Sequence, residues 1–105
     1  MEQPSLNYIE QLSAGDGEFK TTMINVMKNE LPSEIEMYQN FIDSNDFTNA
    51  AQMVHKLKHK ISLLGLENSY KTANQYEKQL NAQQLELKSS FNQILNKMTV
   101  FIKSL

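Results

Sequence analysis

Apolar residues recur at three- and four-residue steps along nearly the whole chain, and the alternation typical of strands is absent. This spacing places apolar side chains on one side of a helix. It predicts a short first helix that stops at the turn at residues 14–17, and then a long helix over residues 19–42. Pro32 falls inside the second pattern and removes a backbone N–H donor, so we expect a kink there.

Polar breaks between the apolar stripes predict where the helices begin and end. Asp16 and Asp46 are side chains suited to cap the second and third helices. Gly65 follows the last apolar residue of the third helix, at the position where a left-handed residue commonly ends a helix. The remaining stripes cover residues 47–64, 66–80 and 87–105, with links at residues 44–46 and 81–84.

Four long amphipathic helices joined by short links predict an all-α fold: an antiparallel four-helix bundle with a short extra N-terminal helix. A chain of 105 residues accommodates one domain, so we expect a single unit over residues 1–105. Met1 followed by a full set of helices favours a free protein over a segment of a larger kinase.

Composition narrows the classes of function. The chain has no cysteine, which excludes disulfides, thiolate metal sites and cysteine nucleophiles. Its net charge is -2 and its basic residues are all lysine, which disfavours a nucleic-acid partner because arginine makes the bidentate contacts. Neither a leader peptide nor an apolar run of membrane-spanning length is visible, so we expect a cytoplasmic protein without membrane contact.

The predicted third helix carries the side chains with the clearest chemical potential. At about 100° per residue, one polar strip at the margin of its apolar face joins His55, Lys58, His59 and Ser62. Lys58 lies on the core side of this strip and would have to extend past His55 to reach solvent. Such a helix holds an imidazole at the surface on a rigid support.

The run from His55 to Lys58, with Gly65 ten residues after the histidine, resembles the motif of the histidine-containing phosphotransfer (HPt) family. In that family a His-x-x-Lys sequence is followed by a small residue and then by a glycine at the helix end. Residues 12–19 and the break at residues 44–46 also resemble the family pattern, so the resemblance covers nearly the whole chain. It implies that His55 accepts and donates a phosphoryl group, and that Lys58 is the electrostatic partner of that group.

The resemblance also implies a phosphorelay carrier of two-component signalling rather than an enzyme. Its partners would be response-regulator receiver domains and a hybrid sensor histidine kinase, and the chain would act as a monomer. The receiver would supply Mg²⁺ and most catalytic groups, so no cofactor of its own is expected. The family usually has glycine after the lysine, so the partner either docks differently or contacts His59. The candidate docking surface consists of Thr48, Gln52, His59 and Ser62.

Two functions of another class remain open for the same helix. One is an interaction module that binds receiver domains without transferring phosphate. The other is a metal-binding helical bundle, because His55 and His59 have the i, i+4 spacing of a helical metal pair, although the adjacent turns offer no obvious third ligand. Lys56 and Lys60 are interpreted as a solvated basic face.

Overall fold

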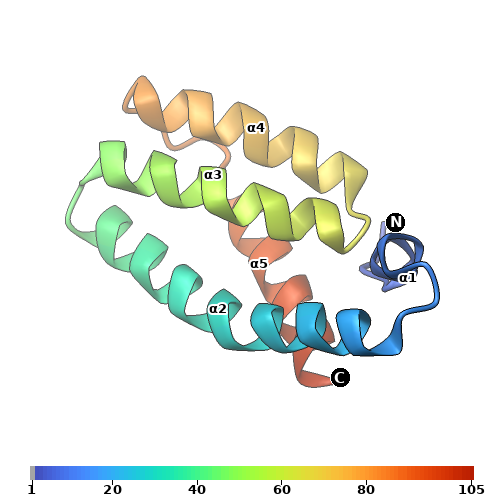
Figure 1. The fold of residues 1–105 in the computed structure, drawn as a ribbon. Coiled ribbons are helices and arrows are strands. Elements are labelled where there is room, and N and C mark those ends of the chain that lie inside the picture. Colours follow the sequence, from blue (N-terminus) through green and yellow to red (C-terminus); the bar gives the residue numbers. More distant parts are fainter. Residues whose placement is uncertain (1) are drawn as a thin grey trace.

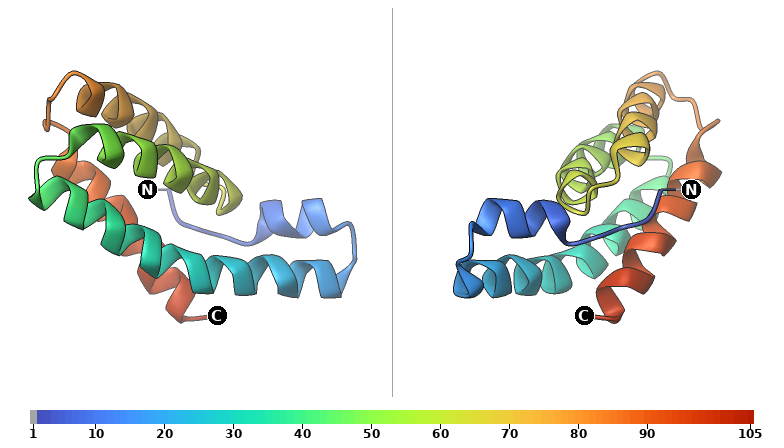
Figure 2. Two further views of the ribbon diagram at one scale, coloured as in Figure 1. Left: turned by 60° about the vertical axis from the view of Figure 1, so that its left-hand side comes forward. Right: turned by 90° about the vertical axis from the view of Figure 1, so that its right-hand side faces the viewer.

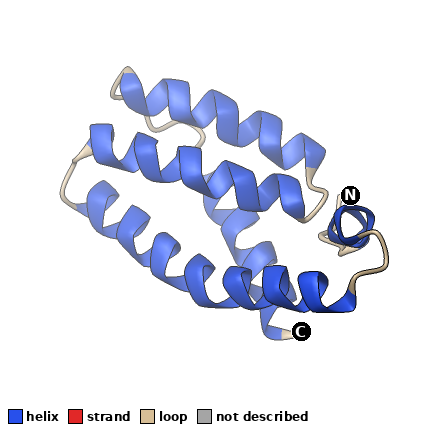
Figure 3. Ribbon diagram, viewed as in Figure 1, coloured by secondary structure: helices blue, strands red, loops and turns tan. Residues whose placement is uncertain are grey.

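The computed structural model describes residues 2–105 and contains five helices (Figures 1 and 3). Within these residues there is no strand, so the all-helical prediction is confirmed. Helices α3 and α4 lie side by side, α2 packs along α3, and α5 contacts both α2 and α4. The helices are α1 (Asn7–Ser13), α2 (Gly17–Asp43), α3 (Phe47–Leu63), α4 (Glu67–Asn81) and α5 (Lys88–Lys103).

The ends of α2 and α3 lie where the local sequence signals predict them. Asp16 accepts hydrogen bonds from two first-turn amides of α2 at 3.1 Å, and Asp46 accepts one from the Asn49 amide at 3.2 Å. Beyond the end of α3, Gly65 has φ 74°, in the left-handed region that glycine tolerates without strain. These signals determine which residues α3 contains and therefore which side chains it presents.

Helix α2 runs through Pro32 without a break, and its axis changes direction near the middle (Figure 2). The N-terminal part of α2 extends past α3 and α4, and α1 is the helix that lies beside it. The apolar pattern predicts burial along the whole stripe, which is wrong here: Leu12, Phe19 and Val26 are all exposed. The reason is geometric, since this part of the molecule has few neighbouring helices to cover an apolar face.

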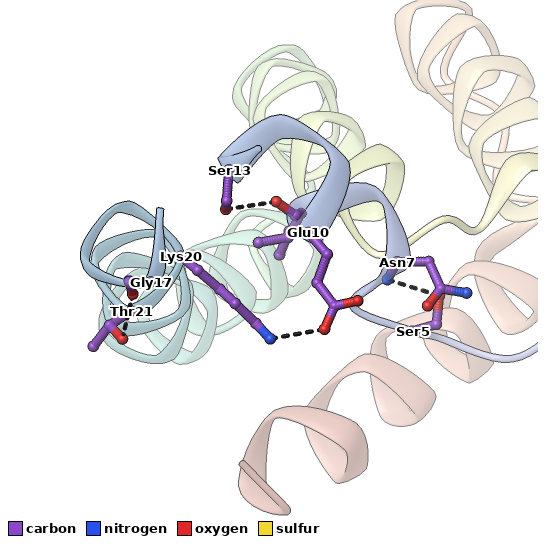
Figure 4. Close-up of polar contacts among 8 residues, drawn as sticks. Ser5, Asn7, Glu10, Ser13, Gly17, Lys20 and Thr21 are labelled. Atoms are coloured by element: carbon purple, nitrogen blue, oxygen red, sulfur yellow. Dashed lines mark hydrogen bonds and ion pairs between the residues drawn. The ribbon is translucent and has the colours of Figure 1, made fainter. Parts of the chain in front are cut away.

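Two features attach α1 to the rest of the molecule. Lys20 Nζ lies 2.7 Å from Glu10 Oε1, which joins α1 to α2 (Figure 4). Ile9 is buried, and its carbonyl also accepts a hydrogen bond from Ser13 Oγ at 2.7 Å within α1. Because an exposed ion pair contributes little, the burial of Ile9 is the main attachment of this short helix.

The N-terminus of α4 is capped by a residue that is distant in the sequence. Leu66 provides no capping side chain, and the Glu2 carboxylate instead accepts hydrogen bonds from the amides of Asn68 and Ser69, at 2.7 and 3.0 Å. Burial opposes the ionisation of Glu2, but these hydrogen bonds outweigh it, so the pKa of Glu2 lies below its ordinary value of 4.5. The segment before α1 is therefore held against the start of α4.

An aromatic cluster in the core fixes the position of α4. Tyr38 of α2, Tyr76 of α4 and Phe91 of α5 have ring centroids 5.1 to 6.2 Å apart. The two hydroxyls lie 2.5 Å apart, and burial raises the pKa of both above the ordinary value of 10. With Tyr76 directed into the core, the next residue, Glu77, is turned by about 100° around the helix and lies beside α3.

The link between α4 and α5 is longer than the predicted link at residues 81–84. It spans residues 82–87, and Gln83 has a positive φ of 59°. The Leu87 amide donates to the side-chain oxygen of Gln79 at 3.1 Å, which ties the end of the link back to α4. Leu87 precedes the first residue of α5, so the helix begins one residue after the start of the predicted apolar stripe.

Candidate functional site

His55 projects from the middle of α3, and its side chain is 57% exposed. His59 lies one turn further along the helix, with its ring centroid 5.5 Å from that of His55 and the two rings nearly perpendicular, at 89°. The other candidate docking residues, Thr48, Gln52 and Ser62, are exposed on the same helix. The strip of exposed polar side chains that the sequence predicts is therefore present, with the exception of Lys58.

Lys58 is buried instead of extending past His55 into solvent. Its side chain is 8% exposed, and Nζ donates to Asn74 Oδ1 at 3.1 Å and lies 2.9 Å from Glu77 Oε1. The same ammonium lies 5.5 Å from the ring centroid of Tyr70. A buried charge is costly unless it has such partners, and all of them belong to α4. The prediction failed because it considered α3 alone, without the polar groups of the neighbouring helix.

Glu77 brings the imidazole and the ammonium together. Its Oε1 atom lies 3.2 Å from His55 Nδ1 and 2.9 Å from Lys58 Nζ. When Nδ1 carries the ring proton it donates to this oxygen, and Nε2 keeps its lone pair. Among residues 2–105, no hydrogen-bond partner is found for Nε2.

Sequence reasoning missed Glu77 and Asn74, although the sequence contains a usable signal. His55 contacts Glu77, and Lys58 contacts Asn74. In each pair, one residue precedes Leu66 in the sequence by the same number of positions as the other follows it. Such spacing is the expected pairing for two antiparallel helices joined by a tight turn. Counting equal numbers of residues before and after the turn at Gly65 would therefore have identified these partners.

Lys60 is not part of a solvated basic face. Its side chain is 11% exposed, and Nζ lies 3.0 Å from a Glu30 oxygen and 2.9 Å from a Glu34 oxygen, both on α2. The interpretation is wrong because Lys60 points toward α2, where two carboxylates are within reach. Lys56 is exposed, as expected for a solvated lysine.

Two hollows lie along α3, one beside His55 and the other beside His59, one turn further along the helix. The smaller, of about 420 Å³, is lined by His55 and Gln52 together with residues of α4. The larger, of about 930 Å³, lies between α1 and the α3–α4 turn and is lined by His59 and Ser62. Thr48 lies about two turns before His55 along α3. The candidate docking residues thus surround His55 along the helix, and three of the four line a hollow.

Within the described part of the chain, no group of three or more His, Asp or Glu side chains is placed to hold a metal ion. None of the five helices in residues 2–105 is both long enough and apolar enough to cross a membrane. Comparisons of the chain with protein-family models, with curated proteins and with solved structures found no match.

Proposed function

We propose that this chain is a phosphorelay carrier of the HPt type. It accepts a phosphoryl group on His55 from the aspartate of one receiver domain and passes it to the aspartate of another. Its partners are response-regulator receiver domains and a hybrid sensor histidine kinase, and it acts in the cytoplasm as a monomer. In this proposal α2 to α5 form an antiparallel four-helix bundle, and α1 is the extra helix.

The observation that carries the proposal is the contact between His55 and Glu77. The imidazole is exposed on a rigid helix, and its Nδ1 lies 3.2 Å from a carboxylate oxygen. A carboxylate that accepts the Nδ1 proton selects the tautomer in which Nε2 keeps a lone pair. A histidine without a chemical role needs no such partner, whereas a nucleophilic histidine needs one protonation state and one orientation.

The transfer requires little covalent chemistry from this chain. The Nε2 lone pair attacks phosphorus in line, and the bond from phosphorus to the aspartate oxygen breaks, so the electron pair leaves with the carboxylate. The proton on Nδ1 stays in place, and the positive charge that develops on the ring faces Glu77. In the second step a carboxylate oxygen of the next receiver attacks phosphorus, and the P–N bond breaks. Mg²⁺ in the receiver offsets charge on the phosphoryl oxygens.

Lys58 contributes positive charge beside this reaction. The ammonium lies 2.9 Å from the carboxylate that contacts the imidazole, so it belongs to the same cluster as His55. By resemblance to the family, it offsets the negative charge that the phosphoryl group adds. Thr48, Gln52, His59 and Ser62 are the exposed side chains of α3 against which a receiver would dock.

Phosphate labelling tests this function directly. The wild-type chain, His55→Gln and His59→Gly are each incubated with receiver domains that carry a radioactive phosphoryl group. Wild type and His59→Gly should acquire label that is labile in acid and stable in alkali, and His55→Gln should acquire none. His59→Gly is the matched control, because it alters the neighbouring histidine and restores the residue type usual in the family.

The same experiment separates the alternatives. Receiver binding without label in any variant would contradict transfer and favour the interaction module. Label that survives in His55→Gln but disappears in His59→Gly would move the phosphorylation site by one helical turn. Metal that copurifies with wild type and is lost in both variants would favour the metal-binding bundle.

A further inference from the structure

The larger hollow, of about 930 Å³, has one wall that comes from the start of the chain. This wall belongs to the N-terminal arm, residues 2–13, which consists of an extended segment followed by α1 (Figure 2). The other walls come from α3, from the α3–α4 turn and from α4. The arm contributes four residues to the hollow: Ser5, Asn7, Tyr8 and Gln11.

Helix α1 has little stability of its own. It has 7 residues, whereas isolated helices shorter than ~12–15 residues are marginal in water. Leu6, at its N-cap, provides no capping side chain. Ala14 follows its C-terminus with φ 50°, in the left-handed region that alanine rarely adopts, and Gly15 has φ 86°. The position of α1 therefore depends on contacts with the rest of the molecule, and the residues that join it to α2 are strained.

Few contacts hold the N-terminal arm in place. Within residues 2–13, Ile9 is the apolar side chain that is buried. The Ser5 amide donates to the Leu64 carbonyl at 3.0 Å, and the Glu2 carboxylate accepts hydrogen bonds from the first turn of α4. The ion pair of Glu10 with α2 is exposed and contributes little. A segment with so few buried apolar contacts opens at a lower free energy than the whole domain unfolds.

We propose that residues 2–13 form a lid, hinged at Ala14 and Gly15 and anchored by Ile9, which swings away from the α3–α4 turn while α2 to α5 stay folded, and which a receiver domain displaces when it docks. The role in docking rests on the proposed function, whereas the opening is a property of this chain alone. The strain at Ala14 belongs to the closed position, because a free segment places no constraint on that residue.

The size of a protein interface explains why docking involves the lid. Specific complexes bury roughly 800 Å² on each partner, which is more than one exposed strip of α3 offers. A receiver at His55 therefore extends onto the elements beside the strip. At the end of the strip that carries His59 and Ser62, both of which line the larger hollow, the neighbouring element is the lid. The lid is also the neighbour that is least firmly held.

Distances between spin labels test the opening without any partner protein. The chain has no cysteine, so labels attach only at introduced cysteines. The pair Gln11→Cys with Lys71→Cys lies on α1 and α4 at the same hollow and reports the position of the lid. The pair Glu36→Cys with Lys78→Cys lies at exposed positions of α2 and α4 and reports whether these helices stay in place.

Variants of the anchor and of the hinge should change the lid distance in opposite directions. Ile9→Ala should raise the ratio of the longer to the shorter lid distance at least about tenfold, because the apolar anchor is lost. Leu12→Ala is the matched control, since Leu12 is exposed on the same helix, and it should leave the ratio unchanged. Ala14→Gly added to Ile9→Ala should lower the ratio about threefold, because glycine adopts φ 50° without strain.

The reference pair decides whether the lid opens by itself. Its distance should be the same in all variants. A lid distance that Ile9→Ala leaves unchanged, or a reference distance that lengthens together with the lid distance at every extent of opening, would overturn the proposal. If Ile9→Ala fails to fold, the milder Ile9→Val should raise the ratio about threefold with the reference distance unchanged.

Receiver affinity then tests displacement of the lid. A receiver that binds the open form has an apparent dissociation constant inversely proportional to the open fraction. Ile9→Ala should therefore tighten binding by the factor measured with the labels while the open form remains the minority, and Ala14→Gly should weaken it. Unchanged or weaker binding in Ile9→Ala would show that the receiver does not displace the lid. If no receiver binds the wild-type chain, the proposed function fails while the distances still decide whether the lid opens.

Discussion

Two lysines of α3 face opposite neighbours, and both are removed from solvent. Lys58 points toward α4 and pairs with Glu77, and Lys60 points toward α2 and pairs with Glu30 and Glu34. Their side chains are similarly buried, at 8% and 11% exposed. What differs is the second partner of the carboxylate, because Glu77 also contacts the exposed imidazole of His55, whereas Glu34 contacts Lys60 on both of its oxygens.

The two lysines are similarly buried, so burial of an ion pair does not by itself distinguish the proposed site from the rest of α3. The Lys60 pair joins α3 to α2 on either side of Pro32, near the middle of a helix that has lost a backbone hydrogen-bond donor there. The Lys58 pair instead connects the interior to the exposed side chain that accepts the phosphoryl group in the proposed function. In the proposed function, the chemical role belongs to the group that shares the carboxylate, and does not follow from the burial of the lysine.

Replacing each lysine with methionine should separate stability from transfer. Lys60→Met leaves Glu34 partly buried without its cation, and should lower the free energy of unfolding by about 2 kcal/mol. Its transfer rate per folded molecule should match wild type. Lys58→Met should slow transfer about tenfold, or about 1.4 kcal/mol in the barrier. Urea denaturation and phosphoryl transfer from one receiver measure the two effects, and equal slowing by both variants would contradict the comparison.

Gly65 ends α3, the helix that carries both lysines, and sets where α4 begins. Gly65→Val should lower the free energy of unfolding by about 1 kcal/mol or more, since a β-branched residue is strained at φ 74°. Steric overlap is not the cause, as an added Cβ would lie 3.5 Å from the Ser5 Oγ atom. Gly17→Val is the control, because an added Cβ there meets nothing within 4 Å and φ lies outside the left-handed region. An equal loss in both variants would show that the left-handed conformation contributes nothing.

Glu2 should have the smallest effect and a distinctive dependence on pH. Glu2→Gln should destabilise the chain by a few tenths of a kcal/mol at neutral pH, because it removes a charge from the N-terminus of α4. The folded pKa lies below 4.5, so this contribution is fully present above 4.5 and is lost as the pH falls through the folded value. Thermal melting of wild type and Glu2→Gln should therefore converge in acid. Glu36→Gln, on an exposed surface of α2, is the matched control for the loss of one carboxylate.

The sequence alone determined the features that depend on neighbouring residues. Apolar periodicity predicted all five helices, and Asp16, Asp46 and Gly65 marked helix ends that the structure confirms. The exposure of His55 also followed from its place at the margin of an apolar stripe. These signals act within one or two helical turns, so no knowledge of the packing was needed to interpret them.

Only the tertiary structure decided what lies opposite each helix. The direction of Lys58, its pairing with Glu77 and Asn74, and the contact of Glu77 with His55 all depend on the register between α3 and α4. The capping of α4 by Glu2 joins residues 66 positions apart. The exposure of Phe19 follows from where the other helices end. A helical pattern specifies which face of each helix is apolar, but the neighbour of that face, and of the polar residues at its margin, is set when all the helices pack together.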